Sequence, residues 1–263
     1  YYTRRNINCQ YDLMRPLVDV RENGKTNEWR EKKMANELLA KAYHFFDERK
    51  EVRLLDCAKF LSFDRLSNGK LRLKKMNSCR VRLCPLCAWR RAKKTYYNTM
   101  SIIEWIKNHD KEYSYIFVTL TVRNCYGDNL NDTVNQLFKS WNRFVGDKDI
   151  KRISHGFCRC LEITHDVNYF ITSQMYKRAK KFYDSRGLKV GDLNPNYNTF
   201  HPHFHVLFCV NKSYFSKGYL TAEQWYTIWG RCLQVDYNPS VSVKKCYGSD
   251  PEVVAECSKY AVK

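Results

Sequence analysis

The sequence predicts an α+β protein in which helices flank an antiparallel β-sheet, preceded by a zinc-binding region of helices and a hairpin. Hydrophobic residues make up 44% of the 263 residues, which is enough for a sizeable core. The second half contains four strand-like runs, separated by other segments without the strict strand–helix alternation of parallel folds. The first half contains cysteines at the spacing of metal ligands.

The charge balance points to a polyanionic partner. Lys and Arg number 46 against 27 Asp and Glu, a net charge of +19. Nucleic acid is the first candidate and an anionic membrane surface the second. No run approaches the roughly 18 consecutive apolar residues of a membrane span, which excludes a transmembrane protein. Single cysteines in apolar runs, such as Cys209, indicate free thiols in a reducing compartment.

The N-terminal elements follow from hydrophobic spacing. Residues 1–28 show no period and are expected to form an extended arm. Residues 29–46 carry an apolar stripe and predict a helix. Residues 52–63 are expected to form the first arm of a hairpin that turns at the Ser-Asn-Gly of residues 67–69. Residues 89–106 predict a second helix.

The composition of the chain changes near residue 113. Residues 115–122 (YIFVTLTV) are β-branched and aromatic, which favours a buried strand. Asn131 or Asp132 can cap the helix that follows, and Gly146 ends it.

Two further strands enclose a long connection. Residues 157–164 (FCRCLEIT) alternate and predict a second strand, and residues 204–210 predict a third. Between them, residues 165–200 read as a basic loop or insertion. Thr221 and Gln224 form a capping-box pattern at the start of another helix.

The chain closes with a strand and a helix. Residues 241–247 predict a fourth strand, and Asp250 with Pro251 makes a good helix start. We expect two domains, a basic N-terminal region at 1–110 and the sheet domain at 111–263.

Three cysteines predict a zinc site. Cys79, Cys84 and Cys87 give C-x4-C-x2-C, which leaves one corner of a tetrahedral Zn²⁺ to fill. Cys57 is the best candidate for the fourth ligand, and His44 and His109 are weaker alternatives.

Residues 70–94 hold ten basic residues and no acidic one. A small zinc module cannot bury that charge, so we expect a surface that contacts the phosphate backbone of DNA. A solvated face that serves solubility is the plainer alternative. The expected DNA-binding residues are Lys74, Lys75, Arg80, Arg82, Arg90, Arg91, Lys93 and Lys94.

A second metal site is expected in the sheet. His203 and His205 share a strand face about 7 Å apart and can hold one divalent cation, while Pro202 suggests that His201 lies at the strand entry. Glu162 is the only acidic residue in the predicted strand 157–164, and it is the expected third ligand. A salt bridge between Glu162 and an arginine is the alternative.

The last residues carry a tyrosine with charged neighbours. Glu256, Tyr260 and Lys263 fall on one helical face, and Lys259 flanks the tyrosine. A tyrosine is a poor nucleophile at neutral pH unless a cation and a metal assist it, so this segment alone is weak support for catalysis.

Taken in order, these segments resemble the rolling-circle plasmid replication initiators of the Gram-positive type, within the HUH (histidine–hydrophobic–histidine) endonuclease superfamily. The resemblance rests on residues 29–33 (WREKK), 79–91 (CRVRLCPLCAWRR), 117–121 (FVTLT), 203–205 (HFH) and 256–263 (ECSKYAVK). Each segment is modest alone, but their joint order is specific and covers nearly the whole chain.

The resemblance implies a nicking and closing reaction in which Tyr260 attacks a DNA phosphate, keeps the 5′-phosphate and frees a 3′-OH. It implies Mg²⁺ or Mn²⁺ on His203, His205 and Glu162. Glu256 would activate water in the terminating cleavage, and Lys259 or Lys263 would stabilise charge. The implied partners are plasmid origin DNA, as duplex, hairpin and single strand, with host helicase and polymerase. A homodimer is left open, no membrane is involved, and the location is the bacterial cytoplasm.

Two other functions compete with this one. A zinc-module DNA-binding regulator without chemistry would explain the charge and the cysteines but would leave His203, His205 and Glu162 idle. A relaxase or single-strand transposase shares the chemistry. Relaxases usually place the tyrosine before the histidines, whereas Tyr260 follows them, and single-strand transposases are generally smaller and lack the cysteine-bearing region.

Overall fold

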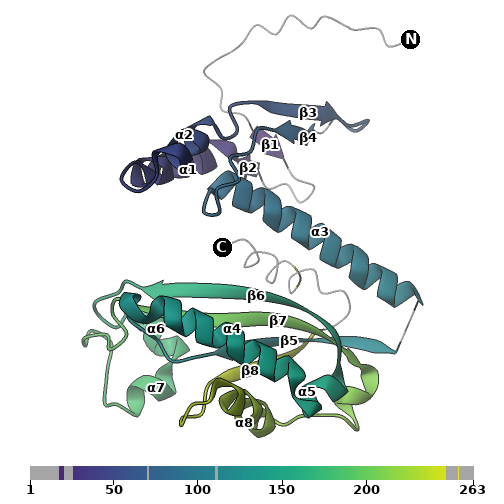
Figure 1. The fold of residues 1–263 in the computed structure, drawn as a ribbon, viewed down its shortest axis with the longest axis vertical. Coiled ribbons are helices and arrows are strands. Elements are labelled where there is room, and N and C mark those ends of the chain that lie inside the picture. The colour runs from purple at the N-terminus through teal and green to yellow at the C-terminus, as the bar shows by residue number, and fades with distance from the viewer. Residues whose placement is uncertain (1–17, 21–25, 70, 110–111, 247–253, 255–263) are drawn as a thin grey trace, which may run out of the picture. The chain divides into compact units, whose positions relative to one another are not determined.

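The computed structural model in Figure 1 describes residues 18–20, 26–69, 71–109, 112–246 and 254. The chain forms two compact units, residues 1–90 and 91–263. The boundary lies inside the long helix α3 (Pro85–His109), which contributes its first turns to one unit and the rest to the other. Within the described residues, no helix combines the length and the hydropathy that a membrane span requires.

The first described elements of this unit are a small antiparallel pair, β1 (Val18–Val20) and β2 (Thr26–Glu28). This pair lies in the segment that was expected to be an extended arm. Helix α1 (Trp29–His44) follows as expected. The predicted hairpin is present as β3 (Leu61–Arg65) and β4 (Leu71–Met76).

The expectation of a hairpin arm from residue 52 was wrong, because helix α2 (Glu48–Asp56) occupies this stretch. Asp47 caps the helix by accepting a hydrogen bond of 3.0 Å from the backbone N–H of Lys50. Glu48 and Glu51 in the first turn stabilise the helix, because their negative charges lie near the positive end of the helix dipole. Cys57 is therefore the residue that ends α2 and does not lie in a strand.

The core of the first unit is small and surrounds the cysteines. The Trp29 ring meets the edges of Phe63 at 6.4 Å and Trp89 at 5.0 Å. Leu54 and the four cysteines of the predicted zinc site are buried in the same cluster. A core of this size gains little from burial alone, so a bound metal would stabilise it strongly.

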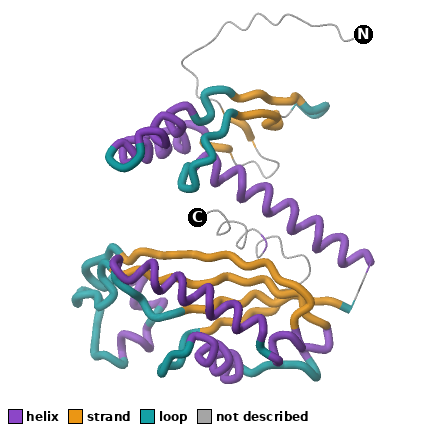
Figure 2. Tube along the Cα trace, viewed as in Figure 1, coloured by secondary structure: helices purple, strands orange, loops and turns teal. Residues whose placement is uncertain are grey.

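The second unit contains the expected antiparallel sheet, in the order β6-β7-β5-β8. Its strands, orange in Figure 2, are β5 (Tyr113–Thr121), β6 (Ser154–Asp166), β7 (Thr199–Asn211) and β8 (Val241–Cys246). The α+β class is confirmed.

Strand β7 starts five residues earlier than expected and contains Pro202. The proline is tolerated because the pairing of β5 with β7 ends at His203, so Pro202 lies beyond the doubly paired part of the strand. His201 is consequently part of the strand, where the sequence suggested a strand entry.

Helices α4 (Leu130–Gly146) and α8 (Ala222–Leu233) cover one face of the sheet, with α5 (Lys148–Ile153) beside them. The expectation that Asn131 or Asp132 caps α4 was wrong, because the helix already starts at Leu130. Asn129, the last residue of the 3-10 turn η1 (Gly127–Asn129), takes the N-cap position without a side-chain hydrogen bond. The capping box of α8 is formed as predicted. Buried rings from helices and sheet fill this core: Trp141, Phe144, Phe204, Phe208, Trp225 and Trp229.

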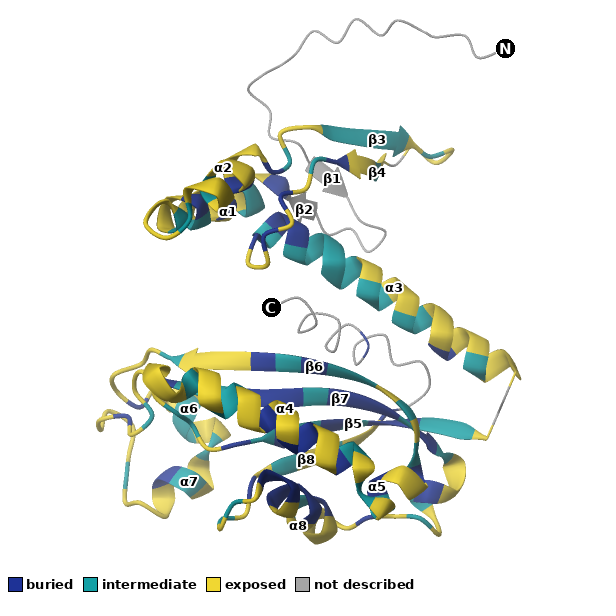
Figure 3. Ribbon diagram, viewed as in Figure 1, coloured by how far each residue is buried: buried dark blue, intermediate teal, exposed yellow. Residues whose placement is uncertain are grey.

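The opposite face of the sheet carries a second, thinner cluster. Ile103 of α3 packs with Tyr115, Leu207 and Cys246 of the sheet. Val254, beyond the end of β8, is buried in the same cluster. Figure 3 shows that β7 is largely buried.

Residues 167–198, called the insertion below, connect β6 to β7. They contain the short helices α6 (Ser173–Arg178) and α7 (Lys180–Asp184), where a loop was expected. The turn η2 (Lys212–Phe215) follows β7.

Candidate functional site

Three side chains converge on the face of the sheet opposite α4 and α8. Nε2 of His203 and Nε2 of His205 lie 3.2 Å apart. Oε2 of Glu162 lies 3.2 Å from the first nitrogen and 3.1 Å from the second. The carboxylate thus meets both imidazoles, as the metal-site prediction requires, and the three form one of the two potential metal-binding groups among the described residues.

This triangle fits one divalent cation. An octahedral ion with ligands at about 2.0–2.1 Å separates neighbouring ligand atoms by about 3.0 Å. The observed 3.1–3.2 Å matches three ligands on one face of the octahedron. Glu162 and His203 are only 8% and 7% exposed, so an ion would offset the cost of burying the carboxylate.

The sheet register explains the convergence. Glu162 pairs directly with His203 across β6 and β7, and Cys160 pairs with His205 in the next row. Alternate residues of a strand share a face, so the two histidines and the glutamate project together.

Each histidine is oriented through its other nitrogen. Nδ1 of His203 lies 3.0 Å from the carbonyl oxygen of His201, and Nδ1 of His205 lies 3.1 Å from Oγ1 of Thr119. Phe117 stacks on the His205 ring at 5.3 Å. An Nδ1–H that donates to these acceptors leaves the Nε2 lone pair for a metal.

His201 does not belong to the metal-binding triangle, which consists of Glu162, His203 and His205. Its ring stacks on His203 at 5.0 Å. Burial, followed by the neighbouring His203, lowers the pKa of His201 to about 4, so the ring is neutral at physiological pH.

Thr119 and Phe117 were not singled out from the sequence as site residues. A signal for them was available, because alternate residues of the FVTLT segment share one face of β5. Once β5 is placed beside β7, the registered partner of His205 is Thr119.

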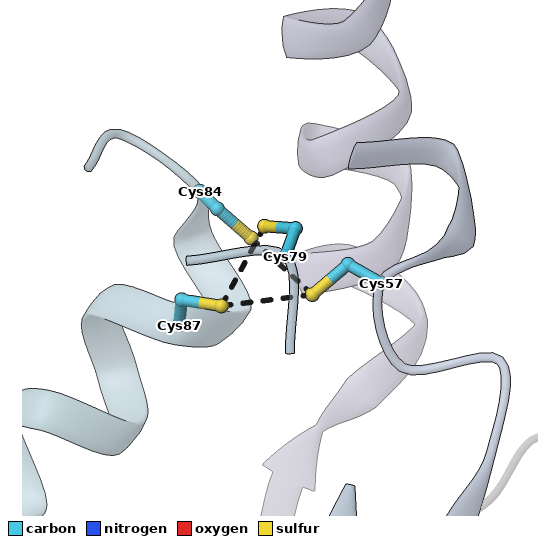
Figure 4. A group of neighbouring side chains, drawn as sticks. All are labelled: Cys57, Cys79, Cys84 and Cys87. Carbon is cyan, nitrogen blue, oxygen red and sulfur yellow. Dashed lines mark hydrogen bonds between the residues drawn. The ribbon is translucent and has the colours of Figure 1, made fainter. Parts of the chain in front are cut away.

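The second metal-binding group is the predicted cysteine cluster in the first unit. Figure 4 shows the sulfurs of Cys57, Cys79, Cys84 and Cys87 turned toward one another. The Sγ–Sγ distances are 3.7 Å for Cys57–Cys87, 3.6 Å for Cys79–Cys87 and 3.7 Å for Cys57–Cys84. Tetrahedral Zn²⁺ with Zn–S bonds of about 2.3 Å separates its sulfurs by about 3.8 Å. The cluster therefore fits zinc.

Cys57, the best candidate for the fourth ligand, lies beside the other three cysteines in this group. The two alternatives lie elsewhere: His44 contacts Glu51, and His109 contacts the carbonyl oxygen of Trp105.

Polar groups from α1 and α2 fix the loops that carry the cysteines. Lys33 donates to the carbonyl oxygen of Cys57 at 2.8 Å, and Arg53 donates to that of Cys79. Asn36, fully buried, donates to the carbonyl oxygen of Leu54 at 2.6 Å and accepts from the Cys84 thiol at 3.0 Å.

Hydrogen bonds within the cluster shift the pKa values of its thiols in opposite directions. Hydrogen bonds from the thiols of Cys57 and Cys84 lower the pKa of Cys87, and the backbone N–H of Arg80 adds to this effect. Hydrogen bonds to Cys57 and Cys87, followed by burial, raise the pKa of Cys84. A cation that replaced the remaining protons would be held by all four sulfurs.

The expected DNA-binding residues lie on three segments around the cluster. Lys74 and Lys75 are exposed on β4, and Arg80 and Arg82 are exposed in the loop between Cys79 and Cys84. The remaining four lie on α3, where they are half-buried or exposed: Arg90, Arg91, Lys93 and Lys94.

Glu256, Lys259, Tyr260 and Lys263 lie outside the described residues. Val254, two residues before Glu256, is buried on the same face of the sheet as the histidine–glutamate triangle.

Comparison with known proteins gives a consistent family. The replication protein family matches residues 70–263. A protein called Protein rep from Bacillus amyloliquefaciens is 33% identical over 94% of this chain and 72% of its own length. Another from Streptococcus pneumoniae serotype 2 is 32% identical over 94% and 71%, and one from Staphylococcus aureus is 29% identical over 89% and 91%. No solved structure matches the chain significantly.

Proposed function

The chain belongs to the replication protein family, the rolling-circle plasmid initiators that its motifs resemble, and we propose that it starts replication by nicking one strand of a plasmid origin. The observation that carries this proposal is the triangle of Glu162, His203 and His205 on one sheet face. A divalent site of this kind serves phosphate chemistry well.

The proposed nucleophile is Tyr260. Its phenol oxygen attacks the scissile phosphorus and loses its proton to solvent or a nearby base. The bond from phosphorus to the 3′ oxygen breaks, and that oxygen takes up a proton to become the free 3′-OH. The 5′-phosphate stays on Tyr260, so the free energy of the phosphodiester is retained without ATP.

The sheet residues hold the metal in this proposal. Mg²⁺ or Mn²⁺ bound by Glu162, His203 and His205 would act as a Lewis acid on a phosphate oxygen. Lys259 or Lys263 is the proposed cation beside the phenolate, and Glu256 the proposed base that activates water in the terminating cleavage.

We propose that the first unit binds the origin. Four thiolates would hold structural Zn²⁺, and the exposed basic residues of β4 and the cysteine loop would contact phosphates. The division at residue 110, the host helicase and polymerase, and a homodimer stay predictions. The free thiols fit the reducing bacterial cytoplasm, which is the location we propose.

A DNA-binding regulator without chemistry is the alternative from another class. It assigns no role to a buried carboxylate held between two imidazoles, so the triangle favours the enzyme.

A supercoiled plasmid that carries the origin tests the proposal. With Mn²⁺, the wild-type protein should convert it to open circles, and Tyr260→Phe and His203→Ala should not. Both variants should still bind the origin duplex, which separates loss of chemistry from loss of folding. Nicking that survives in both variants would refute the proposed chemistry.

A further inference from the structure

The insertion presents three aromatic rings to solvent. Tyr169, Phe170 and Tyr197 are 51%, 55% and 43% exposed. They form one group, since the Tyr169 ring contacts Phe170 at 5.0 Å and Tyr197 at 4.9 Å, both edge-to-face. We call these three residues the aromatic trio.

The backbone around the trio is held firmly. Phe170 forms a β-bridge with Leu193, and the side chain of Asn194 donates to the carbonyl oxygen of Asn168 at 2.8 Å. Ile171, the next residue, is only 1% exposed. The rings are therefore fixed at the surface by their neighbours, and exposed apolar groups that are held in this way mark binding sites.

The insertion is also basic. Its net charge is +4, because it contains six basic residues and two acidic ones, Asp184 and Asp192. The six basic residues are Lys177, Arg178, Lys180, Lys181, Arg186 and Lys189. Aromatic faces within a positively charged segment are the features that bind single-stranded nucleic acid.

The insertion starts close to the metal triangle. It leaves the sheet at the pair Asp166–Thr199, four residues beyond the pair Glu162–His203. At about 3.3 Å per residue, the strands place this exit about 13 Å from the triangle.

We propose that the aromatic trio is a stacking platform for bases of single-stranded DNA next to the cleavage site. Exposed ring faces suit unpaired bases, because the bases of a duplex are already stacked on one another. The identity of the strand rests on the proposed nicking function, but the platform itself does not.

The test is binding of a fluorescent oligodeoxythymidylate of about 12 nucleotides, without Mg²⁺ or Mn²⁺, by fluorescence anisotropy. Tyr169→Ala should weaken binding about 5- to 150-fold, and Tyr169→Phe should restore most of it. An abasic strand of the same length should bind wild type and Tyr169→Ala alike. Tyr219→Ala is the matched control, because Tyr219 is 59% exposed before α8, outside the insertion.

Equal binding of thymidylate by wild type and Tyr169→Ala would overturn the proposal. So would an equal loss on the abasic strand, which would mean an effect on the backbone contacts. A change in sedimentation of Tyr169→Ala with unchanged DNA binding would assign the trio to contact between copies of the chain. Because neither Mg²⁺ nor Mn²⁺ is present, these results are independent of whether the protein nicks DNA.

Discussion

Thr119→Val tests how the sheet prepares His205 for a metal. Oγ1 of Thr119 lies 3.1 Å from Nδ1 of His205. An Nδ1–H that donates to this oxygen leaves Nε2 without a proton and able to bind a metal. Valine has nearly the same shape and favours strands, so β5 should be preserved. Without the acceptor, the tautomer protonated on Nε2 competes with metal binding.

The expected loss follows from what still holds the ring. Removing the hydrogen-bond partner of a metal-ligating histidine costs about 10–100-fold in affinity. Phe117 still stacks on His205, so we expect the lower part of this range, about 10–30-fold or about 1.4–2 kcal/mol.

Calorimetric titration of the zinc-loaded protein with Mn²⁺ measures this loss. Thr119→Ser keeps the oxygen and should bind Mn²⁺ nearly as wild type does. Thr121→Val is the matched control, because Oγ1 of Thr121 donates to the carbonyl oxygen of Ser240 and not to a histidine. Wild-type affinity in Thr119→Val would refute the reasoning.

Three further predictions concern the zinc, a thiol and the DNA contacts. Cys57→Ser should lose zinc and unfold the first unit, because zinc binding contributes about 10–16 kcal/mol to the folding of small zinc modules. Zinc content and hydrogen exchange measure this loss, and Mn²⁺ should still bind to the second unit. A hydrogen bond from Cys160 lowers the pKa of Cys158 to about 7, so alkylation of Cys158 should rise through pH 7, and Cys160→Ala should move that midpoint upward. Lys75→Ala should weaken binding to all DNA sequences alike and reduce the salt slope by about 0.9, as titrations at several salt concentrations would show.

The sheet and both metal groups could be predicted because their signals are local. The alternation of residues around His203 and His205 places both histidines on one face of a strand. Glu162 is the only acidic residue within residues 157–164, and burying its carboxylate in a sheet costs free energy unless a metal or a cation binds it. The short spacing of Cys79, Cys84 and Cys87 in the sequence likewise predicts the zinc site.

Other features depend on contacts that the sequence does not order. Helix α2 buries only Leu54 fully, so it shows little apolar stripe, although Asp47 with Glu48 and Glu51 was a readable helix start. Pro202 fits β7 because of where β5 ends, which is a matter of register. The partnership of Thr119 with His205 likewise appears only when the strands are aligned.

Mass spectrometry of the protein after reaction with single-stranded origin DNA and Mn²⁺ tests the central claim most directly. The account predicts an adduct that resists SDS, with the nucleotide on the peptide that contains Tyr260. An adduct on another residue, or none from protein that binds both Mn²⁺ and the DNA, would contradict it.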